Sequence, residues 1–524
     1  MRVTGTWPDG LETAFRAYED ALMRDDTAVL DALFEPGPDT LRGDGAGLLR
    51  GHDRISAFRS ARGGVARRTL VGVDVQELNA DEVFVVGESR FTDGGRGLQT
   101  QLWRRTAGAW RIRTAHVTGR AVAFDRTVWR AVGDPLVRGA GAGAGAASGA
   151  EAVAGASDAR PLAGVRVAVK DLFAVAGHVI GAGNPTWESA TRVETEHAPA
   201  VSVLLQAGAD VTGIARTDEF AYALAGRNAH TGPPPNGADP ARISGGSTSG
   251  PATAVALGQA DVGLGTDTAG SIRVPASYQG LWGLRTTHGL VSRDGVLPLA
   301  QSFDTVGWLT RQPDTLRAVA TVAVCPAVRS LATPLLVCEA LLAAADPITR
   351  RAFEDWLART GTGVAVVDLP DLDDLAETVR IVQGAEAHRN HGAWVAAHPG
   401  ALGPDVADRF AAAARITAEQ EAAARDGLGR LRSAVRAVVA DGALVLPTVP
   451  GPAPLRTADG PAVLATRRST LRMTAVAGVG GLPAVSAPLL VVDGAPVGVS
   501  LVGPVRSDLA LVDRAAGLAV ATLL

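Results

Sequence analysis

The chain has 524 residues, 47% of them hydrophobic and 20% charged, so it is long enough for two or three globular domains and its composition is not that of a disordered protein. Its formal net charge of -4 gives no electrostatic basis for binding nucleic acid, and no apolar run approaches the ~20 residues of a membrane span. The two cysteines, Cys325 and Cys338, have neither metal-ligand nor disulfide spacing, and the opening MRVTGTWPDGLETAF lacks a signal-peptide pattern. We therefore expect a cytoplasmic protein that binds no nucleic acid and no membrane.

Residues 1–136 predict a small α+β domain. Apolar residues at helical spacing occupy 11–34, and strand-like runs follow at 69–78, 82–91, 98–105 and 109–119. The polar residues suited to a pocket in this domain are Tyr18, Arg42, Arg62 and His116. The alternative is that Tyr18 and His116 are satisfied core residues and the two arginines are solvated, because no local pattern there demands chemistry.

Residues 137–160 form an Ala/Gly-rich tract, which is typical of a flexible linker. Beyond it, residues 161–524 alternate between strand and helix patterns. A strand in GVRVAVKDLF ends at Lys170, and two helix–strand units follow, with Ser249 as the expected N-cap of the second helix. Long helical runs such as 405–439 interrupt this order, and strands resume at 443–450 and 482–489. The pattern predicts an α/β domain with a mixed, mostly parallel sheet covered by helices on both faces.

The segment RISGGSTSGPATAVALGQADVGLGTDTAGSIRVPASYQG, residues 242–280, is rich in small residues and contains two serine-bearing glycine turns. Such turns bring the backbone close to another group. A phosphate-binding turn is one interpretation, but neither G-x-G-x-x-G nor G-x-x-x-x-G-K-[ST] is present. A G-x-S-x-G elbow of a histidine-based hydrolase is also absent from the sequence.

Three motifs together resemble the amidase signature family: AVKD, then SGGSTSG, then GTDTAGSIRVPA. Ser271 in the last motif follows Ser247 in the second by 24 residues. The resemblance covers nearly all of residues 157–524, and pieces such as LWGLRTTHGLVS and MTAVAGVGGLPAVSAPL are most similar to the branch that contains indole-3-acetamide hydrolases. In the first domain, AYEDALMRDDTAVLDALF, GHDRISAFRSARG and WRIRTAHVT resemble AtzH-like domains of the SnoaL-like class. That likeness implies a cone-shaped α+β fold with a curved antiparallel sheet.

The amidase resemblance implies a triad of Lys170 as general base, Ser247 as bridging serine and Ser271 as nucleophile. It also implies a cis peptide bond between Gly246 and Ser247, and an ion pair between Asp267 and Arg273 that stiffens the second turn. The backbone N–H groups that the resemblance assigns to the oxyanion hole are those of Thr268, Ala269, Gly270 and Ser271. A lysine can act as a base only when it is neutral, and burial at the end of a strand would lower its pKa.

Some positions depart from the family pattern. Thr248 stands where many members have a second serine, and Ala269 replaces the usual glycine of the oxyanion turn, which would be strained if that residue needed a positive φ. In EAHRNHG, His388 and His391 favour the edge of a substrate pocket or the surface over a metal site.

The resemblance therefore predicts an amidohydrolase that forms an acyl-enzyme on a small-molecule amide of the arylacetamide type and needs neither a metal nor an organic cofactor. Two alternatives stay open: a ureido or biuret-type hydrolase that works with a catalytic AtzH-like domain, and a noncatalytic scaffold. A transamidase subunit and a homodimer formed through the N-terminal domain are also compatible with the sequence.

Overall fold

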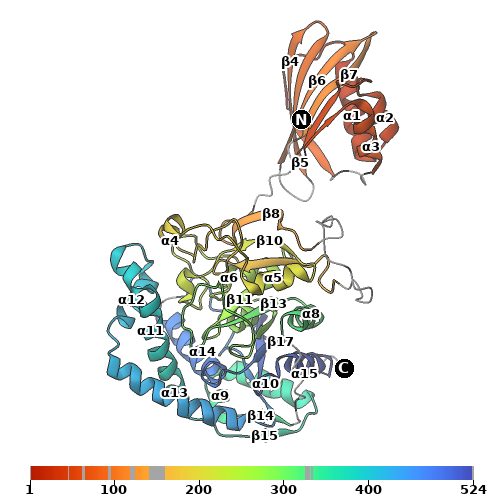
Figure 1. The fold of residues 1–524 in the computed structure, drawn as a ribbon. Helices are drawn as coiled ribbons and strands as arrows, with labels where there is room; N and C mark the ends of the chain where they lie inside the picture. Colours follow the sequence, from red (N-terminus) through yellow and green to blue (C-terminus); the bar gives the residue numbers. More distant parts are fainter. Residues whose placement is uncertain are drawn as a thin grey trace, which may run out of the picture. The chain divides into compact units, whose positions relative to one another are not determined.

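The computed structural model describes residues 2–44, 47–61, 65, 67–91, 96–117, 124–140, 160–324, 331, 334–458 and 460–521. The chain divides into two compact units, Met1–Phe124 and Asp125–Leu524 (Figure 1). The predicted boundary after residue 136 is too late, because strand β8 (Trp129–Val137) pairs antiparallel with β10 (Asp210–Ala215) and so belongs to the sheet of the second unit. Of the predicted linker 137–160, residues 141–159 lie outside the described residues.

The first unit contains helices in the predicted range 11–34, a further helix at 52–61 that was not predicted, and the predicted antiparallel meander. The helices are α1 (Leu11–Arg24), α2 (Thr27–Ala32) and α3 (His52–Ala61); the strands are β1 (Arg2–Thr4), β2 (Leu41–Asp44), β3 (Gly47–Arg50), β4 (Arg68–Asn79), β5 (Glu82–Phe91), β6 (Arg96–Thr106) and β7 (Ala109–Val117). They form one sheet in the order β1-β4-β5-β6-β7-β2-β3. The three strands that sequence patterning misses, β1 to β3, have only three or four residues each, too few to show an alternating pattern.

The second unit is built on a mixed sheet in the order β15-β14-β16-β18-β17-β12-β13-β11-β9-β10-β8. Besides β8 and β10, its strands are β9 (Arg166–Lys170), β11 (Val262–Asp267), β12 (Trp282–Arg285), β13 (Thr305–Thr310), β14 (Leu335–Val337), β15 (Val364–Val366), β16 (Ala443–Pro447), β17 (Ala484–Val492) and β18 (Ala495–Val502). The α/β class with a mixed sheet is confirmed. The expectation of mostly parallel pairing needs correction, because among the described strands six of the ten neighbouring pairs are antiparallel.

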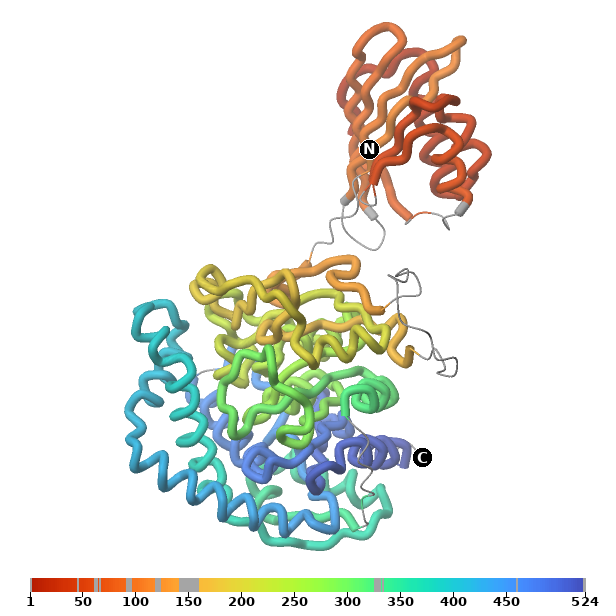
Figure 2. Tube along the Cα trace, in the orientation of Figure 1, coloured from red at the N-terminus to blue at the C-terminus, as the bar shows by residue number. Residues whose placement is uncertain are grey.

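One antiparallel pair explains part of this difference. Strands β17 and β18 are joined by a two-residue turn, Asp493-Gly494, in which both residues have positive φ (49° and 75°). An Asp-Gly pair between apolar runs is a strong hairpin signal, since a type I′ turn needs positive φ at both central positions. Figure 2 shows the C-terminal part of the chain, in blue, returning to the green middle segment, and β17 pairs there with β12.

Helices cover both faces of this sheet. In β9, Val167 and Val169 belong to the large core cluster, whereas Ala168, whose side chain points to the opposite face, packs with residues of α6 (Ser249–Ala256) and α7 (Arg273–Tyr278). The other helices are α4 (Pro185–Ala190), α5 (Pro199–Gln206), α8 (Pro313–Ala323), α9 (Glu339–Ala343), α10 (Pro347–Arg359), α11 (Leu372–Ala397), α12 (Pro404–Ala413), α13 (Ala418–Val438), α14 (Gly460–Gly480) and α15 (Asp508–Ala521).

The predicted helical run at 405–439 is divided into two helices, α12 and α13. The second of them begins after Thr417, whose side chain accepts a hydrogen bond from the backbone of Gln420 while the Gln420 side chain accepts one from the Thr417 backbone. This reciprocal capping box satisfies backbone donors that would otherwise lack partners at a helix start. In Figure 1, α11, α12 and α13 lie together at one side of the second unit.

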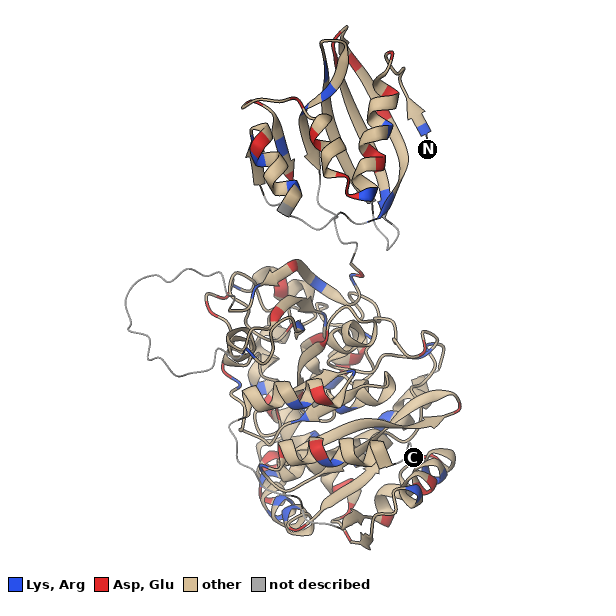
Figure 3. Ribbon diagram, turned by 90° about the vertical axis from the view of Figure 1, so that its right-hand side faces the viewer, with Lys and Arg blue, Asp and Glu red and all other residues tan. Residues whose placement is uncertain are grey.

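Acidic and basic positions are interspersed along both units (Figure 3). None of the helices in the described ranges has the length and apolar character needed to cross a bilayer.

Candidate active site

Lys170 is the last residue of β9, which lies between β10 and β11 and pairs parallel with both. Its side chain is fully buried. The Nζ atom lies 2.9 Å from Ser247 Oγ, 3.0 Å from Thr248 Oγ1 and 2.8 Å from Thr266 Oγ1. Hydroxyl groups therefore surround the amine, and among the described residues it forms no ion pair with a carboxylate.

Burial lowers the pKa of Lys170 from 10.5 to about 7, against the opposing influence of the Asp218, Asp267 and Asp304 carboxylates. A neutral amine has two N–H donors and one lone pair. The hydroxyl of Thr248 donates to the Thr266 carbonyl at 3.2 Å, so its oxygen is free to accept a hydrogen bond from Nζ. With the two threonine oxygens accepting the N–H groups, the lone pair is left for the proton of Ser247 Oγ.

The backbone around Ser247 is tightly held. The expected cis peptide bond between Gly246 and Ser247 is present. The Ser247 carbonyl accepts hydrogen bonds from Thr217 Oγ1 at 2.9 Å and from the Asp218 N–H at 3.1 Å. A Cβ atom on Gly246 would overlap the Asp218 carboxylate, so this close approach requires a glycine.

Ser271 lies in the turn between β11 and α7. Its carbonyl accepts a hydrogen bond from the Thr248 N–H at 3.2 Å, which brings the two serine-bearing turns side by side. Its side chain is almost fully buried and makes no hydrogen bond with the other described residues. The structure thus brings Lys170, Ser247 and Ser271 into one buried region.

Asp267 fixes the shape of the turn formed by Thr268, Ala269, Gly270 and Ser271, called the 268–271 turn below. Its carboxylate binds Arg273 through two hydrogen bonds, at 2.9 and 3.0 Å, as expected, and it also accepts one from Arg285 Nη1 at 3.1 Å. Burial alone would raise the pKa of the Asp267 carboxyl, but the guanidinium groups of Arg273 and Arg285 hold it well below its usual value. Arg285 was not predicted as a site residue. It lies in LWGLRTTHGLVS, a segment that was used only as evidence for the family resemblance.

The predicted set of oxyanion donors needs correction, because one of its four N–H groups already donates to the Asp267 carboxylate. The Gly270 N–H donates to Asp267 Oδ1 at 2.9 Å and is therefore occupied. The N–H groups of Thr268, Ala269 and Ser271 make no hydrogen bond with any group in the described ranges. The positive φ of the turn, +116°, falls on Gly270 and not on Ala269, so alanine at 269 is unstrained.

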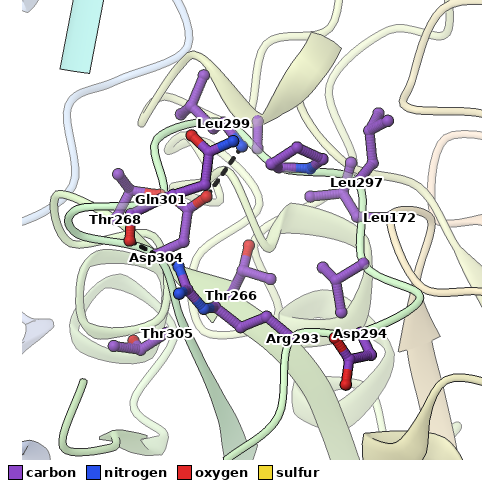
Figure 4. A pocket seen from close by; sticks show the side chains of 13 residues that line it. Leu172, Thr266, Thr268, Arg293, Asp294, Leu297, Leu299, Gln301, Asp304 and Thr305 are labelled. Carbon is purple, nitrogen blue, oxygen red and sulfur yellow. Dashed lines mark hydrogen bonds between the residues drawn. The ribbon is translucent and has the colours of Figure 1, made fainter. Parts of the chain in front are cut away.

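Two cavities border the 268–271 turn. The smaller cavity, of about 310 Å³, is lined by Thr266 and Thr268 and by apolar residues that include Leu172 and Leu297. Figure 4 shows Thr268 hydrogen bonded to Asp304, at 2.6 Å. The larger cavity, of about 630 Å³, is lined by Ala269 and by residues of α11, α12 and α14.

Sequence reasoning did not identify Thr266 or Asp304 as site residues, and it noted Thr248 only as a substitution. Thr266 directly precedes the predicted Asp267, but its contact with Lys170 depends on how β9 and β11 pair. Ser249 is not the N-cap of α6: the helix begins at this residue, with Thr248 preceding it, and Ser249 Oγ donates to Asp218 at 3.3 Å.

The first unit brings only part of its predicted pocket together. Tyr18 and Arg42 are buried, with the Arg42 guanidinium 4.5 Å from the centre of the Phe58 ring, whereas His116 is exposed and Arg62 lies outside the described residues. Burial raises the pKa of Tyr18, while the charges of Arg59, Arg68 and Arg42 act in the opposite direction.

Arg59 and Arg68 were not predicted. Arg59 lies four residues after the fully buried Ile55, on the same face of α3, which is the signal that could have identified it.

The two histidines of EAHRNHG lie in different environments. His388 is exposed, and His391 is buried against the rings of Trp187, Phe220 and Phe410. In the described part of the chain, no group of three or more His, Cys, Asp or Glu residues is arranged to hold a metal ion.

Comparison with known proteins identifies both units. The family model described as Amidase matches residues 136–512, and the model described as AtzH-like matches residues 9–121. Amidase 1 of Arabidopsis thaliana is 37% identical over 396 residues, covering 68% of this chain and 93% of the relative. Translocon at the outer membrane of chloroplasts 64 of Pisum sativum is 31% identical, covering 67% of this chain and 65% of the relative. A crystal structure of an amidase aligns with a TM-score of 0.63 at 31% identity, covering 68% of this chain and 84% of that chain.

The match to the amidase model extends over more than half of the chain and includes the whole region that holds the buried lysine and the two serine turns. The chain therefore belongs to the amidase family of hydrolases that act on amides, and it carries an AtzH-like unit ahead of its amidase unit.

Proposed function

We propose that this chain hydrolyses a carboxamide through a Ser271 nucleophile, with Ser247 as proton relay and Lys170 as general base. The observation that supports the proposal most is the buried Lys170 amine, surrounded by hydroxyl groups, 2.9 Å from Ser247 Oγ and with a pKa lowered to about 7. A base poised near neutral pH combines a useful neutral fraction with sufficient proton affinity.

In the proposed reaction, Ser271 Oγ forms a bond to the amide carbonyl carbon and gives its proton to Ser247 Oγ, whose own proton passes to Lys170 Nζ. The carbonyl oxygen becomes an oxyanion and accepts hydrogen bonds from the N–H groups of the 268–271 turn other than that of Gly270. The C–N bond then breaks, and the leaving amine takes a proton back through Ser247. Water then attacks the acyl carbon and gives a proton to Lys170 through Ser247. The bond to Ser271 Oγ breaks, the proton returns to Ser271 Oγ by the same route, and the acid is released.

We propose an arylacetamide as the substrate type, because apolar residues form part of the lining of both cavities that border the turn. A ureido compound is the second candidate, and the AtzH-like match favours it. In that case the first unit would act on a related anionic compound.

The noncatalytic alternative rests on the likeness to a translocon component. We retain a cytoplasmic location and a homodimer through the first unit as proposals that fractionation and light scattering would test.

Labelling with a fluorophosphonate probe and measurement of ammonia release test the proposal together. The wild-type chain should react with the probe and release ammonia from an arylacetamide, and Ser271→Ala should lose both activities while it remains folded. Ser433→Ala is the matched control, because Ser433 lies exposed on α13 and donates only to the Gly429 carbonyl. Equal probe labelling of wild type and Ser271→Ala would contradict the assignment of the nucleophile.

A further inference from the structure

The larger cavity carries an arginine that the proposed catalytic groups do not use. Arg467 on α14 lines this cavity together with apolar residues that include Leu471 and Tyr222. It is partly buried, and its Nε atom is buried without a hydrogen-bond partner. Among the described residues, Arg467 forms no ion pair with a carboxylate.

Four acidic residues, Asp373, Glu377, Asp405 and Asp408, also line the cavity, and two of them bind arginines of the same wall closely. Asp373 binds Arg472 at 2.7 Å, and Glu377 binds Arg380 at 2.6 Å. These pairs leave Arg467 and the exposed Arg468 as the lining arginines without a carboxylate partner in the described ranges.

Arg409 is a second cation in the wall of the same cavity. Its Nη1 atom donates to the Tyr222 carbonyl at 2.7 Å, and its nearest carboxylate is that of the exposed Asp405, at 3.9 Å. The charge of Arg409 acts on Arg467 in the same direction as burial, which lowers the pKa of Arg467 to about 10. The group is still a cation at neutral pH.

Helix geometry sets the distance between this cation and the reacting centre. Thr474, on α14, donates to the Ala269 carbonyl at 2.9 Å and thus marks the position of the 268–271 turn along the helix. Arg467 precedes Thr474 by seven residues, which is close to two helical turns or ~10 Å along the axis, on the same side of the helix. Leu471, between the two, lines the space that separates them.

We propose that the larger cavity binds the acyl part of an amide that also carries one carboxylate. Arg467 would be the counterion of this carboxylate, and the apolar wall would contact the spacer between the carboxylate and the amide. This inference rests on the proposed function, since in a primary carboxamide the leaving group is only ammonia and the acyl part supplies the recognisable surface. A bidentate guanidinium–carboxylate contact would satisfy the buried cation and its unpaired donor together.

The test compares two matched ligand pairs on the full chain: 4-carboxyphenylacetamide with phenylacetamide, and adipamic acid with hexanamide. Binding to the Ser271→Ala variant is measured by calorimetry, so that the result does not depend on turnover. A hydrogen bond to a charged group contributes about 1.5–3 kcal/mol, so we expect the carboxylated member of at least one pair to bind about 10- to 100-fold more tightly than its neutral partner.

Arg467→Met in the Ser271→Ala background should abolish this preference, and Arg467→Gln is a second variant should the methionine protein not fold. Arg430→Met is the matched control: it removes the same charge from the exposed face of α13, away from the cavity lining, and the preference should remain. Equal affinities within both pairs, no binding of either carboxylated amide, or a preference that survives loss of Arg467 would each overturn the inference.

The two proposals fail in different ways. If the wild-type chain neither reacts with a fluorophosphonate nor releases ammonia from any of the four amides, the proposed catalytic function is wrong, whatever the calorimetry gives. If the four amides are hydrolysed with values of kcat/KM that do not depend on the carboxylate, the catalytic function stands and the assignment of Arg467 is wrong.

Discussion

Replacing Lys170 by methionine should separate its catalytic role from its effect on stability. Methionine has a similar length and is apolar, so it suits the fully buried position, but it cannot accept the proton of Ser247. General-base catalysis typically contributes 10²–10⁴-fold to rate, so we expect kcat/KM of Lys170→Met to fall by about that factor.

The pH dependence of the wild-type enzyme should follow the same group. Only the neutral amine accepts a proton, and burial lowers the pKa of Lys170 to about 7. Below that pH, kcat/KM should fall close to tenfold for each unit, and above it the value should level off.

Substitution of Lys170 should lower activity without lowering stability, whereas in the wild-type chain both quantities rise with pH. The lysine pKa is 10.5 in the reference state and about 7 when folded, so between these values the unfolded chain binds more protons and the free energy of unfolding rises with pH. At 1.36 kcal/mol per unit of pKa, the charged form is disfavoured in the fold by about 5 kcal/mol. Lys170→Met lacks this penalty and should be at least as stable as wild type at neutral pH.

Two measurements decide the matter: kcat/KM from ammonia release between pH 5 and 9 (a range of about four units around the expected midpoint), and urea unfolding of both proteins at the same pH values. Near-normal activity in Lys170→Met, or wild-type activity that is highest under acidic conditions, would refute the assignment of Lys170 as the base.

Two other substitutions test the groups that support the reacting residues. Asp267→Asn removes a buried charge between Arg273 and Arg285, so the free energy of unfolding should fall by about 3–5 kcal/mol and kcat should fall more than KM changes; calorimetric unfolding and steady-state kinetics check this, and an unaffected Tm would contradict it. Gly265→Ala places a Cβ atom where it overlaps the Thr248 side chain, which should displace a hydrogen-bond partner of Lys170 and lower kcat. Gly429→Ala, with open space around its Cβ position, is the control for the added methyl group and should leave kcat unchanged.

Local sequence patterns predicted much of the fold of the second unit, because strand and helix periods are properties of neighbouring residues. The alternation of Val165, Val167 and Val169 placed Lys170 at the end of a strand, where β9 ends in the structure. The pairing direction of distant strands was not accessible in this way. The antiparallel pairing of β12 and β17, for example, joins segments far apart in the chain, and periodicity contains no information about such partners.

The sequence alone identified Lys170, Ser247 and Ser271 as candidates, since their types and spacing carry a family pattern. Tertiary structure decided the environment in which each one lies. The burial of the Lys170 amine, its contact with Thr266 and the occupation of the Gly270 N–H all depend on which distant segments pack together. For the same reason no sequence pattern connects Arg467 with Ala269: the two line one cavity only because α14 runs beside the 268–271 turn, and burial is a property of the whole fold.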